Sequence, residues 1–297
     1  METPILTVVI PTYNRPDSTL GAIGSVLDQD FADLEIVVVD DGSTPPFALP
    51  AALAGDRRVR VVRHETNRGA AAARNTGLAQ GRGRWAAFLD SDDRWRRGSL
   101  APRLAEAEAY AGRGRLVIWA AAFVMVDAVR GPLETRYPMA SADPFDFASG
   151  CWLSAGSTAL FEREPILQRI GGQDETLRRF EDNDWFLRLA LAGGEVRVSR
   201  VVAADIKLGL KPKRDVTDRA AMTIIGKFAA AEIDRKIRAR LLNQLKAWRE
   251  VELASVDWYA GRYWQTATGL AASWLRVPRL RIQLRDFWQR AVPPADL

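Results

Sequence analysis

The sequence predicts an α/β protein in which a doubly wound, mixed but mainly parallel sheet is followed by a C-terminal helical appendage. Apolar runs alternate with helical stretches through the first 90 residues, most of these runs are β-branched, and no strand pattern occurs after about residue 217. Repeated strand and helix imply right-handed parallel connections, and continuous apolar runs suit strands that are buried on both faces.

Local signals predict the individual elements in order along the chain. Pro16 and Pro46 suit the first turn of a helix, and Gly193 and Gly194 suit the end of one. A looser region containing Pro, Gly and Ser spans about 130–157. Strands are expected at residues 6–11, 35–41, 59–64, 84–90, 115–127 and 157–164. Helices are expected at residues 16–28, 46–54, 69–80, 99–111 and 182–192, and from 217 onward.

The composition is that of an ordinary globular protein. The 297 residues are 47% hydrophobic and 27% charged, and no run approaches the roughly 18–20 apolar residues of a transmembrane helix. The N-terminus lacks a basic leader, so no signal peptide is expected. Cys151 is the only cysteine, which excludes an intramolecular disulfide and favours a cytoplasmic location. With His64 as the only histidine, any metal would be bound mainly by oxygen atoms.

Positive charge is concentrated in the last third of the chain. Residues 201–297 carry 18 Lys and Arg against 10 Asp and Glu, which bears on anionic partners such as membrane lipids or phosphates. Residues 276–290 have the pattern of a helix that lies in a membrane interface, although the same apolar face could dock on the rest of the chain. Peripheral contact with the inner membrane face is therefore one expectation for this basic, tryptophan-rich tail. The apolar face would carry Val277, Leu280, Leu284, Phe287 and Trp288.

Polar residues follow four of the expected strands. Ligands of open α/β sheets bind at the carboxyl ends of the strands. Any one of these polar segments could be a turn or a helix cap, but four on one rim favour a ligand site. The acidic cluster in the last of these segments, at residues 90–93, either forms a solvated turn or binds a cation. The segments are Pro11–Arg15, Asp40–Ser43, Asn67–Gly69 with Arg74 and Asn75, and Asp90–Asp93.

Four segments resemble the ordered motifs of the family 2 glycosyltransferases, which are inverting enzymes of the GT-A fold. The segments are "TVVIPTYNR", "EIVVVDDGST", "TNRGAAAARNTGLAQGRGRWAAFLDSDDRW" and "GGQDETLRRFEDNDWFLRL". The resemblance covers roughly residues 5–200. It implies a GT-A catalytic domain over residues 1–215, with a donor half at 1–98 and an acceptor half at 99–215, followed by the helical appendage at 216–297.

The resemblance also implies roles for individual residues. The donor would be a UDP-, dTDP- or GDP-sugar, and the acidic cluster would be the family's DxD-type motif, which contacts the ribose and a divalent metal chelated by the diphosphate. A hard cation such as Mg²⁺ or Mn²⁺ would offset the charge of the leaving group. The expected metal ligands are Asp92 and Asp93. The expected donor-binding residues are Pro11, Thr12, Tyr13, Asn14, Arg15, Asp40, Asp41, Asn67, Arg74, Asp90, Ser91 and Asp92.

The catalytic base is expected in the acidic segment that follows Phe180. Inversion requires a carboxylate across the sugar from the leaving group, and the resemblance places it at Glu181 or Asp182, with Asp182 preferred. The alternative is plain helix capping, because the macrodipole favours carboxylates at a helix N-terminus. Asp184 and Arg188 are spaced to pair with each other at i,i+4 and to orient the helix.

One departure from the family concerns the metal. Many GT-A enzymes supply a third ligand, often His, from a C-terminal loop, and this chain has no His after His64. The loop at 205–215 offers cations that could close over the diphosphate, or it could be a solvated basic loop. These cations are Lys207, Lys211, Lys213 and Arg214.

The function expected from the sequence is non-processive, inverting transfer of one sugar to a hydroxyl of a saccharide or lipid-linked acceptor, in cell-surface polysaccharide or glycan assembly. No QxxRW motif of processive synthases is present. An alternative is an inactive nucleotide-sugar-binding protein that uses its helical tail as an interaction module. No nucleic-acid partner is expected, and the oligomeric state is left open. A dinucleotide-dependent dehydrogenase is disfavoured because the first strand is not followed by G-x-G-x-x-G.

Overall fold

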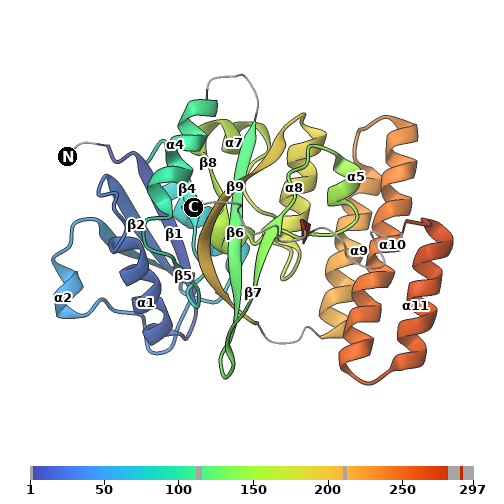
Figure 1. Ribbon diagram of the computed structural model, residues 1–297, viewed down its shortest axis with the longest axis horizontal. Coiled ribbons are helices and arrows are strands. Elements are labelled where there is room, and N and C mark those ends of the chain that lie inside the picture. Colours follow the sequence, from blue (N-terminus) through green and yellow to red (C-terminus); the bar gives the residue numbers. More distant parts are fainter. Residues whose placement is uncertain (1–2, 112–115, 210–212, 280–287, 290–297) are drawn as a thin grey trace, which may run out of the picture.

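A computed structural model describes residues 3–111, 116–209, 213–279 and 288–289. It contains one curled sheet with helices on both faces and a group of long helices at one end (Figure 1). The strands are β1 (Leu6–Thr12), β2 (Leu34–Asp40), β3 (Val59–Arg63), β4 (Trp85–Phe88), β5 (Arg94–Trp95), β6 (Val117–Asp127), β7 (Gly131–Pro138), β8 (Leu160–Glu162), β9 (Glu195–Lys207) and β10 (Trp288–Gln289). The helices are α1 (Pro16–Leu27), α2 (Ala51–Ala54), α3 (Ala70–Gln80), α4 (Leu100–Tyr110), α5 (Pro144–Phe147), α6 (Ala155–Thr158), α7 (Arg163–Arg169), α8 (Glu181–Leu191), α9 (Arg214–Ala230), α10 (Arg235–Tyr259) and α11 (Tyr263–Arg276).

The sheet has parallel strands in its N-terminal half and mixed pairing beyond it. Its order is β10-β7-β6-β8-β4-β1-β2-β3, and β9 pairs with both β5 and β6. Strands β4, β1, β2 and β3 run parallel, β8 and β7 are antiparallel to their neighbours, and β9 is parallel to β6. This arrangement confirms the predicted mixed α/β sheet with a helical C-terminal part.

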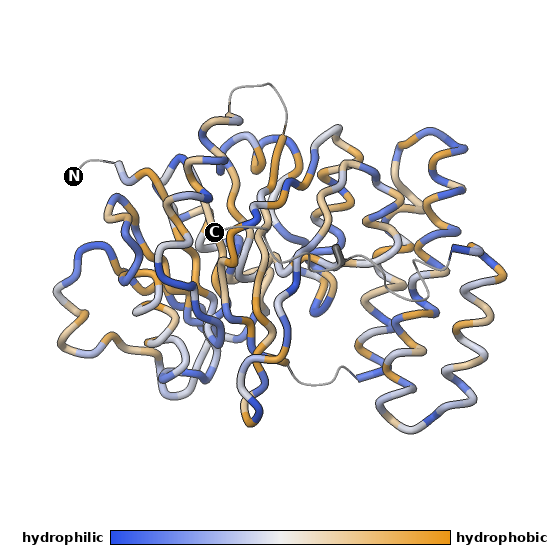
Figure 2. The backbone as a smooth tube through the Cα atoms, in the orientation of Figure 1, coloured by the Kyte–Doolittle hydropathy of each residue, from blue (hydrophilic) through white to orange (hydrophobic). Residues whose placement is uncertain are grey.

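The sheet is buried on both faces, as the continuous apolar runs predicted. Every residue of β1 and β2 is buried, so alternate side chains enter two different cores. Val8 belongs to the same buried cluster as Ile23 of α1 and Leu104 of α4, while Val9 belongs to the other cluster, with Leu78 of α3. The hydropathy colouring shows these central strands as apolar runs (Figure 2).

Each element predicted within the first 111 residues has a counterpart in the structure, as do the strand expected at 115–127 and the helix expected at 182–192. Strands β7 and β9 were not predicted, because most residues of β7 are exposed or half-buried and charged residues interrupt β9. The helix expected over 46–54 is wrong in length, since only Ala51–Ala54 are helical. The strand expected over 157–164 is also too long: its first residues belong to α6, and only Leu160–Glu162 form a strand.

The C-terminal helices share a core with the sheet. Helices α9, α10 and α11 stand side by side at one end of the molecule (Figure 1). Phe228 of α9 and Trp248 of α10 belong to the same buried cluster as Trp185 of α8. The expected boundary between residues 215 and 216 falls within the first turn of α9 and stays a prediction.

The expected helix over 276–290 is wrong where the structure describes it. Helix α11 ends at Arg276, residues 277–279 are not helical, and Trp288–Gln289 form a short strand that pairs with β7. Residues 280–287 lie outside the described part of the chain, together with Leu280, Leu284 and Phe287 of the expected apolar face. No helix within the described residues is long and apolar enough to cross a membrane.

Candidate active site

A cleft of about 600 Å³ lies at the carboxyl ends of β1, β2 and β4. It gathers residues from all four predicted polar segments, as expected for an open α/β sheet. Asn14, Asp40, Asp93 and Asp182 were also expected at the site and do not line the cleft. The lining residues are Pro11, Thr12, Tyr13, Arg15, Asp41, Asn67, Gly69, Ala70, Ala73, Arg74, Asp90, Ser91, Asp92, Arg178, Arg179 and Glu181.

The loop after β1 is fixed to the loop after β2. Asn14 has a φ of 53°, a left-handed conformation that Asn tolerates better than most residues. Its N–H donates to Ser43 Oγ at 2.9 Å, and its Oδ1 accepts from the N–H of Thr44 at 2.8 Å. These bonds hold Tyr13 and Arg15, on either side of Asn14, at the wall of the cleft.

The two aspartates after β2 have different surroundings. Asp40 is fully buried and accepts hydrogen bonds from the N–H groups of Ser43 and Phe47 and from the Arg63 guanidinium. Burial alone would raise the pKa of Asp40, but these hydrogen bonds lower it below its ordinary value. Asp40 therefore orders the loop that follows it, and a direct contact with the donor stays a prediction.

Asp41 reaches the cleft and is held from three sides. Its carboxylate accepts from the N–H groups of Arg68 at 2.9 Å and Gly69 at 2.7 Å, and from His64 Nδ1 at 2.7 Å. Since an ionised carboxylate only accepts, His64 donates through Nδ1, and its Nε2 forms a second hydrogen bond with Thr76 Oγ1 at 2.9 Å. His64, whose role in the site the sequence did not predict, thus orients Asp41.

Arg74 joins the donor side of the cleft to the helix that carries the expected base. Its guanidinium is almost fully buried and donates to Asp90 Oδ1 at 2.6 Å and to Glu181 Oε1 at 3.1 Å. Burial alone would lower the pKa of Arg74, but the carboxylates of Asp90 and Glu181 raise it above its ordinary value. A Cβ at Gly156 would lie 2.2 Å from Asp90 Oδ2 and 2.7 Å from the Arg74 guanidinium, so any larger residue there would displace this ion pair.

The three carboxylates of the acidic cluster diverge. Asp90 pairs with Arg74, and Asp92 pairs with Arg15 at 2.5 Å. Asp93 turns into the protein, where it accepts from the Ser157 hydroxyl and from the N–H of Lys207 at 2.8 Å. Burial and the neighbouring Asp90 raise the pKa of Asp93 to about 7.

The contacts of Asp90, Asp92 and Asp93 show how well this acidic cluster suits a divalent cation. Among the residues that the structure describes, no group of three or more His, Cys, Asp or Glu side chains could hold a metal ion. Magnesium in nucleotide sites takes one or two protein carboxylates and completes its shell with phosphates and water. Asp90 and Asp92 both line the cleft, so they could hold a cation that a diphosphate shares, provided that the cation replaces their present arginine partners. Both Asp93 oxygens already have donors, so its expected metal role stays a prediction that its geometry does not favour.

Glu181 and Asp182 begin α8, and only Glu181 lines the cleft. Asp182 is partly buried; its Oδ1 accepts from the N–H of Asn183 at 2.8 Å, and the Cys151 thiol lies 3.4 Å from its Oδ2. Burial and the carboxylate of Glu181 raise the pKa of Asp182 to about 6. A carboxylate with this pKa is ionised at pH 7 and more basic than an ordinary aspartate. Asp182 can therefore accept a proton near neutral pH.

The C-terminal helices hold this part of α8 in place. Phe180 has a left-handed backbone with φ of 65°, and its ring packs edge-on against Trp248 of α10 at 4.7 Å between centroids. Lys227 of α9 pairs with Asp174 and with the fully buried Asp184, each at 2.8 Å. Asp184 also pairs with Arg188 at 2.8 Å, as predicted from their spacing.

Several residues of the site were not predicted from the sequence. Arg178 and Arg179 line the cleft, and Arg178 donates to Asn67 Oδ1 at 3.1 Å. Gln173 accepts from Arg74 at 3.1 Å. These residues belong to the "GGQDETLRRFEDNDW" segment. Its two adjacent arginines, just before the expected base, were the feature of the sequence that could have predicted positive charge in the cleft.

The basic loop at 205–215 is only partly described. Arg214 forms an ion pair with Asp257 of α10 at 2.9 Å, which holds it on the helical part. Lys211 lies outside the described residues. Closure of Lys207 or Lys213 over a diphosphate stays a prediction.

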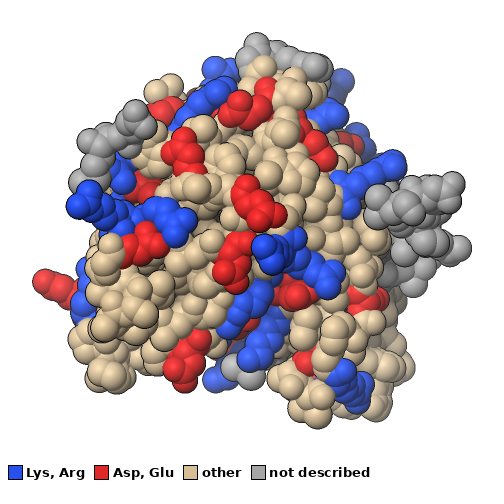
Figure 3. All heavy atoms as spheres, turned by 60° about the vertical axis from the view of Figure 1, so that its left-hand side comes forward, with Lys and Arg blue, Asp and Glu red and all other residues tan. Residues whose placement is uncertain are grey.

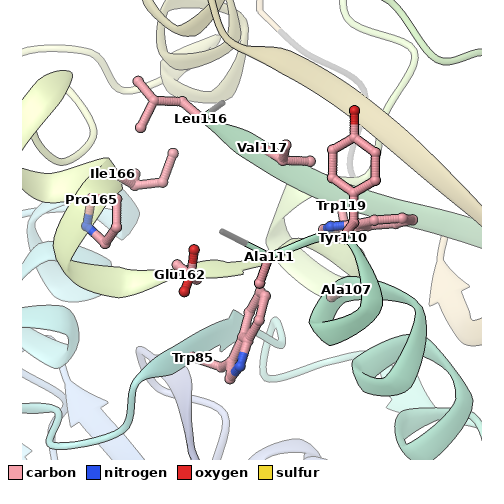
Figure 4. A pocket seen from close by; sticks show the side chains of 10 residues that line it. All are labelled: Trp85, Ala107, Tyr110, Ala111, Leu116, Val117, Trp119, Glu162, Pro165 and Ile166. Carbon is pink, nitrogen blue, oxygen red and sulfur yellow. The ribbon is translucent and has the colours of Figure 1, made fainter. Parts of the chain in front are cut away.

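A second pocket, of about 20 Å³, lies at the opposite end of β4 (Figure 4). Trp85, Glu162 and Trp119 surround it, and its volume holds little more than one water molecule. The cleft at the carboxyl ends of the strands is therefore the better candidate for a substrate site.

The face drawn in Figure 3 shows Lys and Arg interspersed with Asp and Glu, so charge on this face is mixed.

The sequence model of Glycosyl transferase family 2 matches residues 7–166. The chain is 43% identical over 106 residues to the succinoglycan biosynthesis protein ExoO of Rhizobium meliloti, covering 36% of this chain and 30% of that protein. It is 38% identical over 95 residues to the UDP-Glc:alpha-D-GlcNAc-diphosphoundecaprenol beta-1,3-glucosyltransferase WfgD of Escherichia coli, covering 32% and 38%. It is 27% identical over 190 residues to the amylovoran biosynthesis glycosyltransferase AmsB of Erwinia amylovora, covering 61% and 62%. The matches thus span less than two thirds of each of these relatives.

The fold is similar to that of a solved structure over nearly the whole chain. Residues 1–349 of S. aureus TarS in complex with UDP-GlcNAc align with a TM-score of 0.63 and 18% identity, covering 93% of this chain and 82% of that one. At this identity the likeness concerns the fold, including the helical C-terminal part.

Proposed function

The chain belongs to glycosyl transferase family 2, and on this premise we propose that it is an inverting, non-processive glycosyltransferase. It moves one sugar from a nucleoside diphosphate to a hydroxyl group of an acceptor. One observation carries the proposal: a single cleft joins the well-held Asp41 on the donor side, through buried Arg74, to Glu181 at the start of α8, and Asp182 follows Glu181 directly.

The donor side has groups that suit a nucleoside and its phosphates. Asp41 offers a carboxylate to a base N–H or a ribose hydroxyl, and Arg15, Arg178 and Arg179 supply positive charge along the same cleft. TarS has been crystallised with UDP-GlcNAc and with UDP, which supports a UDP-sugar as the first donor to test.

The acceptor side has the base. The acceptor hydroxyl oxygen attacks the anomeric carbon from the face opposite the diphosphate and forms the new glycosidic bond. Its proton passes to the Asp182 carboxylate, and the bond between the anomeric carbon and the diphosphate oxygen breaks with its electron pair on the departing nucleoside diphosphate. Arg74 holds Glu181, the residue next to the base, while it stays paired with Asp90.

A divalent cation, Mn²⁺ or Mg²⁺, suits this leaving group. Asp90 and Asp92 would hold it together with the donor phosphates, and when bound it would neutralise negative charge on the diphosphate. Arg15, which pairs with Asp92, would then be available to the phosphates.

The relatives support a place in cell-surface polysaccharide assembly. ExoO and AmsB bear the names of succinoglycan and amylovoran biosynthesis, and the name of WfgD specifies a diphosphoundecaprenol acceptor. A saccharide or lipid-linked saccharide is therefore the proposed acceptor class.

A donor panel tests the function. The protein is incubated with UDP-, dTDP- and GDP-sugars, with and without Mn²⁺, and both thermal stabilisation and release of nucleoside diphosphate are measured. We expect one nucleotide class to stabilise the protein and to be turned over, faster when an acceptor saccharide is added. Stabilisation without any turnover would favour the inactive binding protein instead, and no stabilisation by any nucleotide would contradict both.

A further inference from the structure

The outer face of α11 is apolar and has no partner among the described residues. Thr266 and Ser273 are buried toward α10, and a Cβ at Gly269 would lie 3.3 Å from Ala254 of that helix. The opposite face exposes Trp264 by 77% and Leu275 by 83%. No charged residue occurs from Tyr263 to Leu275. Helices at a protein surface usually expose charged residues there, so this face is unusual for a surface in contact with water only.

Aromatic residues gather where α10 turns into α11. Trp258 and Tyr263 pack edge-on with 5.1 Å between ring centroids, and both are more than half exposed, as is Tyr259. Beside them a groove of about 370 Å³ opens between the two helices. Its walls are formed by Val251, Ala254, Ser255, Trp258, Tyr259, Thr266 and Leu270. Tyr and Trp with one exposed edge are the side chains that favour the boundary between water and lipid.

The charge of the two helices is positive. The stretch from Arg235 to Arg279 contains nine Lys and Arg and three Asp and Glu. All three carboxylates already pair with arginines: Glu250 with Arg249, Glu252 with Arg179, and Asp257 with Arg214 and Arg262.

Unpaired positive charge lies at one end of the apolar face. Arg276 and Arg279 have no ion pair with a described carboxylate. The carbonyl of Arg276 accepts from Asn243 of α10 at 2.9 Å, so the end of α11 lies beside the basic first half of α10. The apolar face is thus bordered by aromatic rings at one end and by arginines at the other.

We propose that the outer face of α11 docks this protein on an anionic lipid bilayer. The helix lies along the surface, with Trp264 and Leu275 inserted between headgroups and Arg276 and Arg279 against lipid phosphates. The charge favours this partner over a second copy, because two copies of this surface would bring the same excess of arginine together. The proposal goes beyond sugar transfer and does not depend on it, since the bilayer would be bound with or without a donor.

Vesicle sedimentation tests the proposal with the full chain. One set of vesicles contains about one third phosphatidylglycerol in phosphatidylcholine, and the other contains phosphatidylcholine alone. We expect the protein to sediment with the anionic vesicles at least about tenfold more strongly, and added salt to weaken that binding. Absence of binding to the anionic vesicles at moderate salt would overturn the proposal.

Paired variants identify the face. The variant Trp264→Ser/Leu275→Ser should reduce vesicle binding at least about tenfold, because two exposed apolar side chains no longer enter the bilayer. The matched control Val129→Ser/Leu133→Ser removes two exposed apolar residues from the β6–β7 hairpin and should bind like the wild type. Arg276→Gln/Arg279→Gln should weaken binding to anionic vesicles only.

Two further measurements separate other outcomes. A melting temperature and a rate of nucleoside diphosphate release equal to those of the wild type show that Trp264→Ser/Leu275→Ser is folded. If this folded variant binds vesicles as well as the wild type does, the proposal is overturned. Size-exclusion chromatography over a range of concentrations detects self-association. A dimer that the Trp264→Ser/Leu275→Ser variant breaks, without vesicle binding by the wild type, would assign the face to a second copy instead.

Discussion

Asp182, which lies beside the cleft, has a raised pKa and no direct arginine partner. Asp90, Asp92 and Glu181 each contact a guanidinium, whereas Asp182 contacts the N–H of Asn183 and the Cys151 thiol. Arginine contacts favour the ionised form, while burial disfavours it. These surroundings fit the proposed role of Asp182 as the proton acceptor, whereas Asp90, Asp92 and Glu181 are tied to arginines.

The pH dependence of transfer follows from this pKa. Asp182 accepts a proton only when it is ionised, so kcat/KM should rise with pH up to about 6 and level off above it. Initial rates of nucleoside diphosphate release across pH 4.5–8 measure this dependence. A rate that falls with rising pH through this range would contradict the assignment of a base.

His64 should matter for donor binding more than for the chemical step. It donates to Asp41 and is hydrogen-bonded to the Thr76 hydroxyl, so His64→Ala leaves the Asp41 carboxylate with two backbone donors and a looser position. We expect KM for the donor to rise about tenfold with little change in kcat, which corresponds to one lost hydrogen bond to a charged group. His64→Asn retains a polar group of similar reach and should recover part of the affinity. A change confined to kcat would contradict this role.

At the scale of elements, helix α9 supports the start of α8. Lys227 pairs with Asp174 in the preceding loop and with the buried Asp184. Lys227→Met should lower the free energy of unfolding by about 1–3 kcal/mol, because Arg188 is then the remaining cationic partner of the buried Asp184. The same variant should lower kcat more than it raises KM. The matched control Lys246→Met changes an exposed residue of α10 and should have neither effect. Both variants are compared by thermal unfolding and steady-state kinetics. The same stability and the same kcat in the two variants would contradict a supporting role for Lys227.

The elements that the sequence predicted well are those whose surroundings are uniform. Strands β1 and β2 are buried on both faces, so their apolar runs needed no knowledge of partners. The sequence missed β9, since its pairing with β6 and β5 depends on segments far away in the chain. For the same reason the sequence could name Asp90, Asp92 and Asp93 together but not show that Asp93 turns toward Ser157 and the N–H of Lys207.

At the scale of the whole molecule, the helical C-terminal part is built into the fold. Phe228, Leu245 and Trp248 lie in the same buried cluster as Trp185 and Phe186 of α8. Separation at residue 215 would expose this cluster, and Phe180 would lose the Trp248 ring against which it packs.

A truncation tests this integration. A chain that ends after residue 213 loses several large buried side chains, each contributing on the order of 2 kcal/mol, which together approach the net stability of a typical domain. We expect it to be insoluble or to lack a cooperative thermal transition. Truncation after residue 279 removes only β10 from the described elements and serves as the control. A soluble, cooperatively folding 1–213 fragment would show that the two parts fold independently.

Acceptor-dependent release of nucleoside diphosphate from Asp182→Asn is the sharpest test of the proposal that sugar is transferred in this cleft with the neighbouring Asp182 as base. The amide keeps the shape of the side chain and can still accept from the N–H of Asn183, but it cannot take the acceptor proton. We predict a fall in kcat of about 10²–10⁴-fold with donor affinity nearly unchanged, while Asp127→Asn, in the exposed β6–β7 turn, keeps wild-type rates. A kcat within a few-fold of the wild type would contradict the account.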